Sequence, residues 1–352
     1  ADGGGISGAR WRSPELVLKR VHKGVPLACR SVVWEQLFGW SELHTDAAAN
    51  AWRRHVNAPF LHDGEQIDLD INRETRSHVR FVERYGAGQQ SLWRVLKVFA
   101  LHDRHVGYCQ AMSSIAALLL VFLDETKAFA AFTHLFAERD RRYLLRRVFL
   151  PDFPLLQQVT FVHNWLMQRY FAAVHAELEG NGMSVEVYGT EWFLKVFVHR
   201  LPFPIVLRVW DLYAVYGYDV VFAVALTIFD QLGARLGTTF DSIIPTLQKL
   251  EARTDIDEER FVTAVVAWRA KIAKHWPVLR AAWDERREEA RTQQRQYEQQ
   301  LAAAGGDESA LKARRHSQQR VRKPPAGAQW DLIFPTTPPS ASAAQVLHRD
   351  VV

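Results

Sequence analysis

Two short stretches, well separated in the chain, carry side chains suited to phosphoryl-transfer chemistry. The first places Ile67, Asp70 and Arg73 at steps of three, and the second puts Tyr108 two residues before Gln110. An arginine offers a delocalised charge and a fork of N–H donors to a transferring phosphoryl group. A glutamine can hold and orient the attacking water. Together the two side chains indicate a role in the hydrolysis of GTP.

The chain shows no cradle of its own for the phosphates of a nucleotide. The glycine-rich start, Gly3 to Gly8, lacks the lysine of a P-loop. After Gly86 and Gly88, Ser91 stands where a dinucleotide-binding loop has its third glycine. An arginine and a glutamine without a nucleotide site point to an activator of a GTPase and away from a GTPase.

Each of these side chains also has an ordinary structural interpretation. Arg73 could form only a surface ion pair with Asp70, worth about 0.5 kcal/mol or less. Gln110 could satisfy a buried turn, and Tyr108 could be a core aromatic with a bonded hydroxyl. Further arginines continue the same helix face, so spacing alone does not select Arg73.

Composition narrows the class of protein. Of the 352 residues, 48% are hydrophobic, with 12 Trp and 20 Phe, which is ample for a large core. The net charge is +5, and the basic residues are mixed with 39 acidic ones along the chain. Bulk nucleic-acid binding is therefore not expected. Two cysteines without a Cys-x-x-Cys pair predict neither a disulfide framework nor structural zinc, and they fit a reducing compartment. The most apolar run, 115–123, is too short to span a bilayer, and no secretory signal opens the chain.

Two apparent metal sites fail on their spacing. Asp68, Asp70 and Asn72 begin like a calcium loop, but Arg73 stands where such a loop has glycine. His102 and His105 could share a helix face, but no carboxylate or cysteine set completes a site. We therefore expect no metal or cofactor of the protein's own.

Hydrophobic periodicity predicts an all-α fold, a single large domain of many short helices over 23–283. A flexible leader is expected at 1–22, and a charged helical extension and a disordered, basic and proline-rich tail at 284–352. The basic segment within that tail could contact anionic lipid. Strand-like alternation is scarce. The expected helices are 27–38, 67–85, a helix capped by Ser91, 111–123, 126–137, 140–149, 154–179, 204–216, 220–236 and 261–276.

Four motifs in order resemble the TBC domain family, whose members activate Rab-type small GTPases. The first is Arg30-x-x-x-Trp34-x-x-Leu37-x-Gly39. The second and third are Ile-x-x-Asp-x-x-Arg, ending at Arg73, and Tyr-x-Gln, ending at Gln110. The downstream block is similar to the family's later signature and contains Glu191-Trp192, Phe197, Leu201-Pro202, Leu207, Trp210-Asp211 and Gly217.

The resemblance implies a mechanism with two fingers supplied to the GTPase. By matching position, Arg73 would be the arginine finger and Gln110 the glutamine finger that orients the hydrolytic water. Asp70 would hold Arg73, and Tyr108 would fix the loop of Gln110 near the GTPase. Ile67 and Arg30 would support the site, Arg30 from the scaffold.

The resemblance also implies the partner. This is a Rab-type GTPase in its GTP form, which carries the Mg²⁺ itself. The protein is expected to be a cytoplasmic monomer, recruited peripherally to endomembranes through the GTPase.

Two departures from the family pattern leave alternatives open. Glu74 follows Arg73 where the family usually has threonine, and Ala111 follows Gln110 where it usually has glycine. A positive φ at Ala111 would be strained. The alternatives are a TBC-type binding module that does not accelerate hydrolysis and a helical scaffold that uses its basic tail at membranes.

Overall fold

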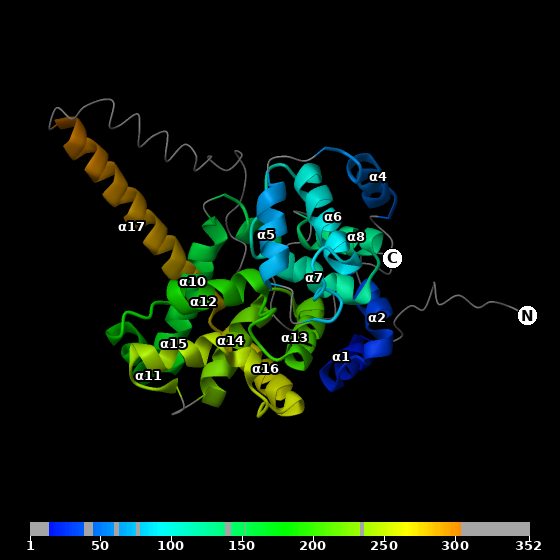
Figure 1. The fold of residues 1–352 in the computed structure, drawn as a ribbon. Helices are drawn as coiled ribbons and strands as arrows, with labels where there is room; N and C mark the ends of the chain where they lie inside the picture. The colour runs from blue at the N-terminus through cyan, green and yellow to red at the C-terminus, as the bar shows by residue number, and fades with distance from the viewer. Residues whose placement is uncertain are drawn as a thin grey trace, which may run out of the picture.

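The computed structural model describes residues 14–38, 45–59, 63–74, 78–137, 142–151, 153–232 and 236–303. These residues form helices and turns, and none of them is in a strand (Figure 1). The predicted all-α fold of many short helices is therefore confirmed for the described part.

The described residues of the first half of the chain form nine short elements. They are α1 (Pro14–Lys23), the 3₁₀ turn η1 (Leu27–Cys29), α2 (Arg30–Phe38), α4 (Thr45–His55), α5 (Gly64–Glu74), α6 (Ala87–His102), α7 (Met112–Phe122), α8 (Glu125–Leu135) and α9 (Leu145–Val148). The second half supplies α10 (Pro154–Tyr170), α11 (Ala172–Gly180), α12 (Val185–Lys195), α13 (Phe203–Tyr216), α14 (Asp219–Leu232), α15 (Phe240–Gln248), η3 (Leu250–Ala252), α16 (Glu258–Ala273) and α17 (Trp276–Ala303).

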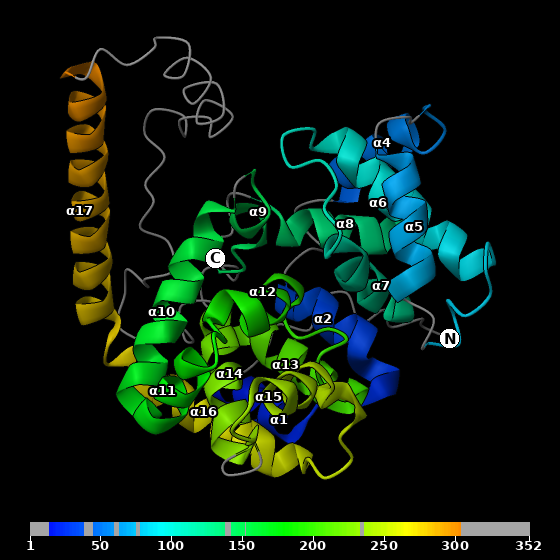
Figure 2. The same cartoon turned by 60° about the vertical axis from the view of Figure 1, so that its left-hand side comes forward.

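The helices form two groups, one from each half of the sequence. Helices α4 to α8 pack on one another on one side, and α10 to α16 form the larger group on the other (Figures 1 and 2). Contacts of α7 with α12 join the two groups, and α1 and α2 pack on α13 of the second group.

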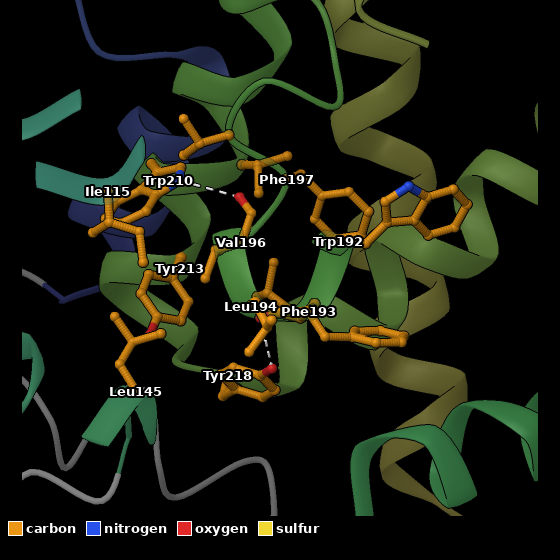
Figure 3. Packing of buried hydrophobic residues seen from close by; sticks show 14 of the residues in the cluster. Ile115, Leu145, Trp192, Phe193, Leu194, Val196, Phe197, Trp210, Tyr213 and Tyr218 are labelled. Carbon is orange, nitrogen blue, oxygen red and sulfur yellow. Dashed lines mark hydrogen bonds between the residues drawn. The ribbon is translucent and has the colours of Figure 1, made fainter. Parts of the chain in front are cut away.

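The core between them is built on α12, α13 and the turn that joins them. Trp210 and Tyr218 are buried, and each donates a hydrogen bond to a backbone carbonyl of the α12 end (Figure 3). The indole of Trp210 reaches the carbonyl of Val196 at 3.2 Å, and the hydroxyl of Tyr218 reaches that of Phe193 at 2.9 Å. These large side chains fill the core and also satisfy carbonyls that the helix end leaves without partners.

Helix α13 ends at a glycine for a steric reason. Gly217 has φ +75°, and a Cβ on it would lie 2.6 Å from the carbonyl oxygen of Arg142. The same carbonyl accepts a hydrogen bond from the Tyr218 amide at 2.8 Å. Glycine lets the segment before α9 reach the end of α13.

The predicted leader is wrong for the part of it that the structure describes. Residues 14–22 belong to α1, whose Val17 and Val21 are buried against the core. The two valines recur at a step of four, which places them on one helix face. Residues 1–13 lie outside the described part.

The predicted helix over 67–85 is also wrong beyond Glu74. Residues 78–86 form turns that fold back onto α6, where the Gln89 side chain accepts from the Tyr85 amide and donates to the Phe81 carbonyl. Gly88 permits this contact, because a Cβ there would collide with the Arg80 carbonyl. Ser91 is not a cap but lies inside α6, which begins at Ala87.

Two further helix predictions need revision. The expected helix 140–149 is reduced to α9, and the expected helix 154–179 is divided at Phe171, whose φ and ψ are −134° and 46°. Helices α4 and α15 were not predicted at all.

Helix α17 crosses the predicted domain boundary at 283 without interruption. Trp283 packs on Phe161 of α10, with ring centroids 5.2 Å apart. Beyond it the side chains up to residue 299 are largely exposed, and the helix projects away from the body (Figures 1 and 2). The predicted tail after Ala303, with its basic segment, lies outside the described residues, as does Gly39.

Candidate functional site

Helix α5 positions Arg73 by burying its opposite side. Ile67 and Ile71 are buried in the core, which places α5 against α6 and α7. Asp70 lies on the same face of the helix as the two isoleucines and is also fully buried. Arg73 follows one turn later, and its side chain is 60% exposed. The helix therefore presents this arginine to solvent from a firmly packed base.

Asp70 joins two segments that are distant in sequence. Its Oδ1 accepts hydrogen bonds from Arg73 Nη2 at 2.9 Å and from Gln66 Nε2 at 3.0 Å. Its Oδ2 accepts a hydrogen bond from the Tyr108 hydroxyl at 2.9 Å. A buried carboxylate needs such donors, because leaving it without them would cost several kcal/mol. One carboxylate thus connects the helix of Arg73 to the loop that carries Gln110.

The loop between α6 and α7 is braced at its start. The Asp103 carbonyl accepts from the Gly107 amide at 2.8 Å, and Gly107 has φ +65°. Asp103 Oδ2 also lies 2.9 Å from Arg146 Nη1 on α9. These contacts tighten the turn that leads to Tyr108.

Gln110 is exposed at the end of this loop, immediately before α7. Its carbonyl accepts a hydrogen bond from Ser113 Oγ at 2.8 Å, which ties the backbone to the first turn of the helix. Ala111 has φ −67° and ψ −14°, a conformation that any residue adopts. The alanine in place of the family's usual glycine therefore causes no backbone strain. Glu74 is the last residue of α5, and its side chain lies outside the described part.

Basic side chains gather beside this loop. Arg54 and His55 end α4, His102 ends α6, and Arg104 follows in the loop. Burial lowers the pKa of His55, and the charges of Arg54, His102 and Arg104 lower it further. These four side chains therefore lie close together, at the start of the loop that carries Gln110.

The structure places Arg30 in the scaffold and not with the other predicted site residues. Arg30 is buried, and its Nη2 lies 3.0 Å from Asp211 Oδ2 on α13. Burial raises the pKa of Asp211, and the hydrogen bonds and charge of Arg30 oppose that rise. Its supporting role is therefore to hold α2 against α13, away from any partner surface.

Two contributors to the site were missed by sequence reasoning. Gln66 precedes Asp70 by four residues, a spacing that could have revealed their contact. Arg146 braces Asp103 from a distant part of the chain, for which no local pattern gives a signal.

Within the described residues, no group of three or more His, Cys, Asp or Glu side chains could hold a metal ion. His102 and His105 are part of that described set. No helix of this part of the chain is long and apolar enough to cross a membrane.

Comparison with known proteins agrees with the fold. Residues 27–236 match the Rab-GTPase-TBC domain family. The chain is 30% identical over 218 residues to the Rab GTPase-activating protein tbc-11 of Caenorhabditis elegans, covering 62% of this chain and 23% of that protein. It is 32% identical over 253 residues to Carabin of Mus musculus, covering 69% of this chain and 54% of that protein. In both relatives the match spans only part of their length.

Two solved structures share the fold. The flagellar RabGAP TBC domain of Chlamydomonas has a TM-score of 0.62 at 22% identity, covering 72% of this chain and 84% of that one. The Ypt/Rab-GAP domain of Gyp1p has a TM-score of 0.61 at 18% identity, covering 73% and 93%.

Fold and site together define an all-α domain in which one buried carboxylate joins an arginine-bearing helix to a glutamine-bearing loop. The chain belongs to the Rab-GTPase-TBC domain family. The resemblance drawn from the four sequence motifs is thereby confirmed.

Proposed function

We propose that this protein accelerates GTP hydrolysis on a Rab-type small GTPase by supplying Arg73 and Gln110 to the active site of the GTPase. Family membership supports the class of activity, and the position of the two side chains supports the mechanism. The single observation that carries the proposal is the Asp70 carboxylate, which accepts from both Arg73 and Tyr108 at 2.9 Å.

The two side chains have distinct roles in the proposal. Arg73 neutralises the negative charge that spreads over the transferring γ-phosphoryl group, a contribution worth roughly 10³ to 10⁵ in rate when it is supplied in trans. Gln110 orients the attacking water. Both roles depend on positioning, because phosphoryl transfer requires electrostatic stabilisation more than covalent chemistry. The shared carboxylate supplies that positioning, since it fixes the bases of both segments.

The exposure of Arg73 fits this role. An arginine with most of its surface in water is available to a docking partner, and Asp70 keeps its hydrogen bonds from Gln66 and Tyr108 when the partner's phosphates take its place beside Arg73. The GTP and Mg²⁺ belong to the GTPase, and the activator adds no cofactor. The protein is expected to act as a cytoplasmic monomer that the GTPase recruits to its membrane, with no bound nucleic acid.

Single-turnover GTP hydrolysis across a panel of purified Rab proteins tests the proposal. The chain is compared with Arg73→Ala and Gln110→Ala, and with two surface controls, Arg260→Ala on α16 and Gln157→Ala on α10, which are both exposed. We expect acceleration on one or a few Rab proteins, a loss of at least about 10²-fold in either finger variant and none in the controls.

Absence of acceleration on every Rab, or finger variants as fast as the controls, would refute the catalytic role. Tight binding of a GTP-loaded Rab with slow turnover would instead support a binding module that docks the GTPase without activating it.

A further inference from the structure

A pocket of about 370 Å³ lies on the flank of the helix that carries Arg73. Asp68 and Ile71 of α5 line one wall, and Gln90 and Trp93 of α6 line the other. Tyr85, in the turn before α6, lines it as well. Helices α5 and α6 pack directly on each other, next to the end of α4 (Figures 1 and 2). The pocket therefore borders the proposed finger helix without including either finger.

The charge available in this pocket is negative. The Asp68 side chain is half-buried, and its carboxylate forms no hydrogen bond or ion pair with any residue that the structure describes. Arg94 also lines the pocket, but its Nε donates to Glu125 at 2.8 Å, so that its charge is already neutralised. Lys97, which is buried nearby, donates to the Val56 carbonyl at 2.9 Å. Asp68 is thus the carboxylate in the pocket that a ligand could pair with.

The aromatic walls favour the same kind of ligand. The Lys97 ammonium lies 5.1 Å from the centre of the Trp93 ring, and the Arg84 guanidinium lies 4.9 Å from that of Tyr85. Both rings therefore already accept a cation, through the attraction of a positive charge to an aromatic face. Asp68 lines the same pocket as these two rings, and its carboxylate suits an ammonium or a guanidinium group. An anion would be repelled by Asp68, and an apolar group would bury its charge without a partner.

The pocket lies within reach of a partner that touches Arg73. Leu69 is 64% exposed, and it lies one helical turn before Arg73 on the same face of α5. Asp68 is the next residue round the helix, roughly 100° away. A protein seated over Leu69 therefore extends from Arg73 to the pocket within the width of one helix, about 10 Å.

We propose that the pocket between α5 and α6 receives a lysine or arginine side chain of the bound GTPase, and that this contact contributes to the choice of partner. The inference rests on the proposed function, because it takes the GTPase as the occupant. A buried charge-assisted hydrogen bond would discriminate between GTPases that carry the basic residue and those that lack it.

The first test measures affinity without hydrolysis. Rab proteins loaded with a non-hydrolysable GTP analogue are titrated with the chain, with Asp68→Asn and with Glu65→Gln. Glu65 is an exposed acid on the same helix and serves as the matched control. For the Rab that the chain accelerates, we expect Asp68→Asn to weaken binding about 10-fold to 100-fold and Glu65→Gln to change it less than about twofold.

The outcomes separate this inference from the proposed function. Equal affinity of the chain and Asp68→Asn would overturn the pocket assignment even if hydrolysis is accelerated. Binding that depends on Asp68 without any acceleration would support the pocket and refute only the catalytic role. Failure of every Rab to bind would overturn both.

A second test probes the pocket chemistry directly. The indole N–H signal of Trp93, assigned by its loss in Trp93→Phe, is followed by NMR during titration with Nα-acetyl-arginine amide and with Nα-acetyl-glutamine amide. We expect a saturable shift with the arginine probe alone, and its loss in Asp68→Asn. A shift of equal size with both probes, or none with either, would contradict a site for cations.

Discussion

Two arginine–aspartate pairs in this molecule have nearly the same length and opposite uses. Arg30 and Asp211 approach to 3.0 Å with both side chains buried, whereas Arg73 and Asp70 approach to 2.9 Å with the arginine 60% exposed. In each pair the aspartate is fully buried and accepts from an aromatic side chain as well, the Trp34 indole at 2.7 Å or the Tyr108 hydroxyl at 2.9 Å. The arginines differ in exposure, since Arg30 is buried and Arg73 faces solvent.

The difference shows how one residue type can serve either the fold or a partner. Arg30 is committed to the protein, because its guanidinium also donates to the Val25 carbonyl at 2.7 Å and lies against the Trp34 ring. Its removal would leave a buried carboxylate uncompensated. Arg73 can exchange its carboxylate for a phosphoryl group, because its own side chain is largely exposed and Asp70 keeps its hydrogen bonds from Gln66 and Tyr108. Four predictions test this contrast.

Replacement of Arg73 should give the largest effect, and the effect should be on rate alone. Arg73→Ala removes the charge that stabilises the transferring phosphoryl group, so we expect a loss of roughly 10³-fold to 10⁵-fold in stimulated hydrolysis. The free energy of unfolding should change by less than about 1 kcal/mol. Single-turnover kinetics and urea unfolding measure the two quantities. Arg73→Lys keeps the charge and loses the fork, and it should recover only part of the rate. A large loss of stability in Arg73→Ala would contradict the contrast.

Replacement of Arg30 should have the reverse effect. Arg30→Ala leaves Asp211 buried without its partner, and we expect the protein to lose about 3–5 kcal/mol of stability. Urea unfolding measures this loss, with Arg260→Ala as the control for an exposed arginine. Any remaining folded protein should keep its rate of stimulated hydrolysis. An Arg30→Ala protein of normal stability would show that the buried pair does not hold α2 against α13.

Replacement of Asp70 should combine both effects at moderate size. Asp70→Asn keeps the shape of the side chain but weakens its bonds to Arg73 and Tyr108. We expect a stability loss of about 1–3 kcal/mol and a rate loss of about 10-fold to 100-fold. Gln66→Ala removes one donor to the same carboxylate and leaves Arg73, Tyr108 and Gln110 in place, and it should affect both quantities less. If Asp70→Asn hydrolyses GTP as fast as the unchanged chain, the carboxylate does not position the fingers.

The contrast between buried and exposed groups also predicts a pH dependence of stability. His163 is fully buried on α10 beside Tyr188, and burial lowers its pKa to about 3. The unfolded chain therefore binds a proton below about pH 6.5 that the folded chain does not, and stability falls as the pH falls. The titration of His163 should lower the free energy of unfolding by about 1 kcal/mol between pH 7 and pH 5.5. In urea unfolding, His163→Gln should lose less stability than the unchanged chain over that pH range. If His163→Gln loses as much stability as the unchanged chain, other groups cause the pH dependence.

The fold class and the family could be predicted because they depend on local patterns. Helical periodicity identified α7 and α13 closely, and the order of the four motifs selected the family. Helix α4 was missed because its buried positions are Ala48 and Ala51, which give little apolar signal. The turns at 78–86 were missed because the contacts of Gln89 and Gly88, which are tertiary, decide them.

The site was predictable only within each segment. The i,i+3 spacing of Asp70 and Arg73 predicts their contact. The bond from Tyr108 to Asp70 joins positions 38 apart, so it depends on how α5 packs on α6 and α7. The same holds for the pocket, since Asp68 and Trp93 become neighbours only through helix packing.

The projecting part of helix α17 has a fixed length and direction. Trp283 carries the last ring of the helix that packs on the body. Gln299 is the sixteenth residue after it, so this part of the helix spans about 24 Å. Every residue inserted or removed in that span would shift Ala303 by about 1.5 Å and turn it by roughly 100° about the helix axis. The length of α17 therefore sets both the distance and the direction from the helical body at which the described part of the chain ends.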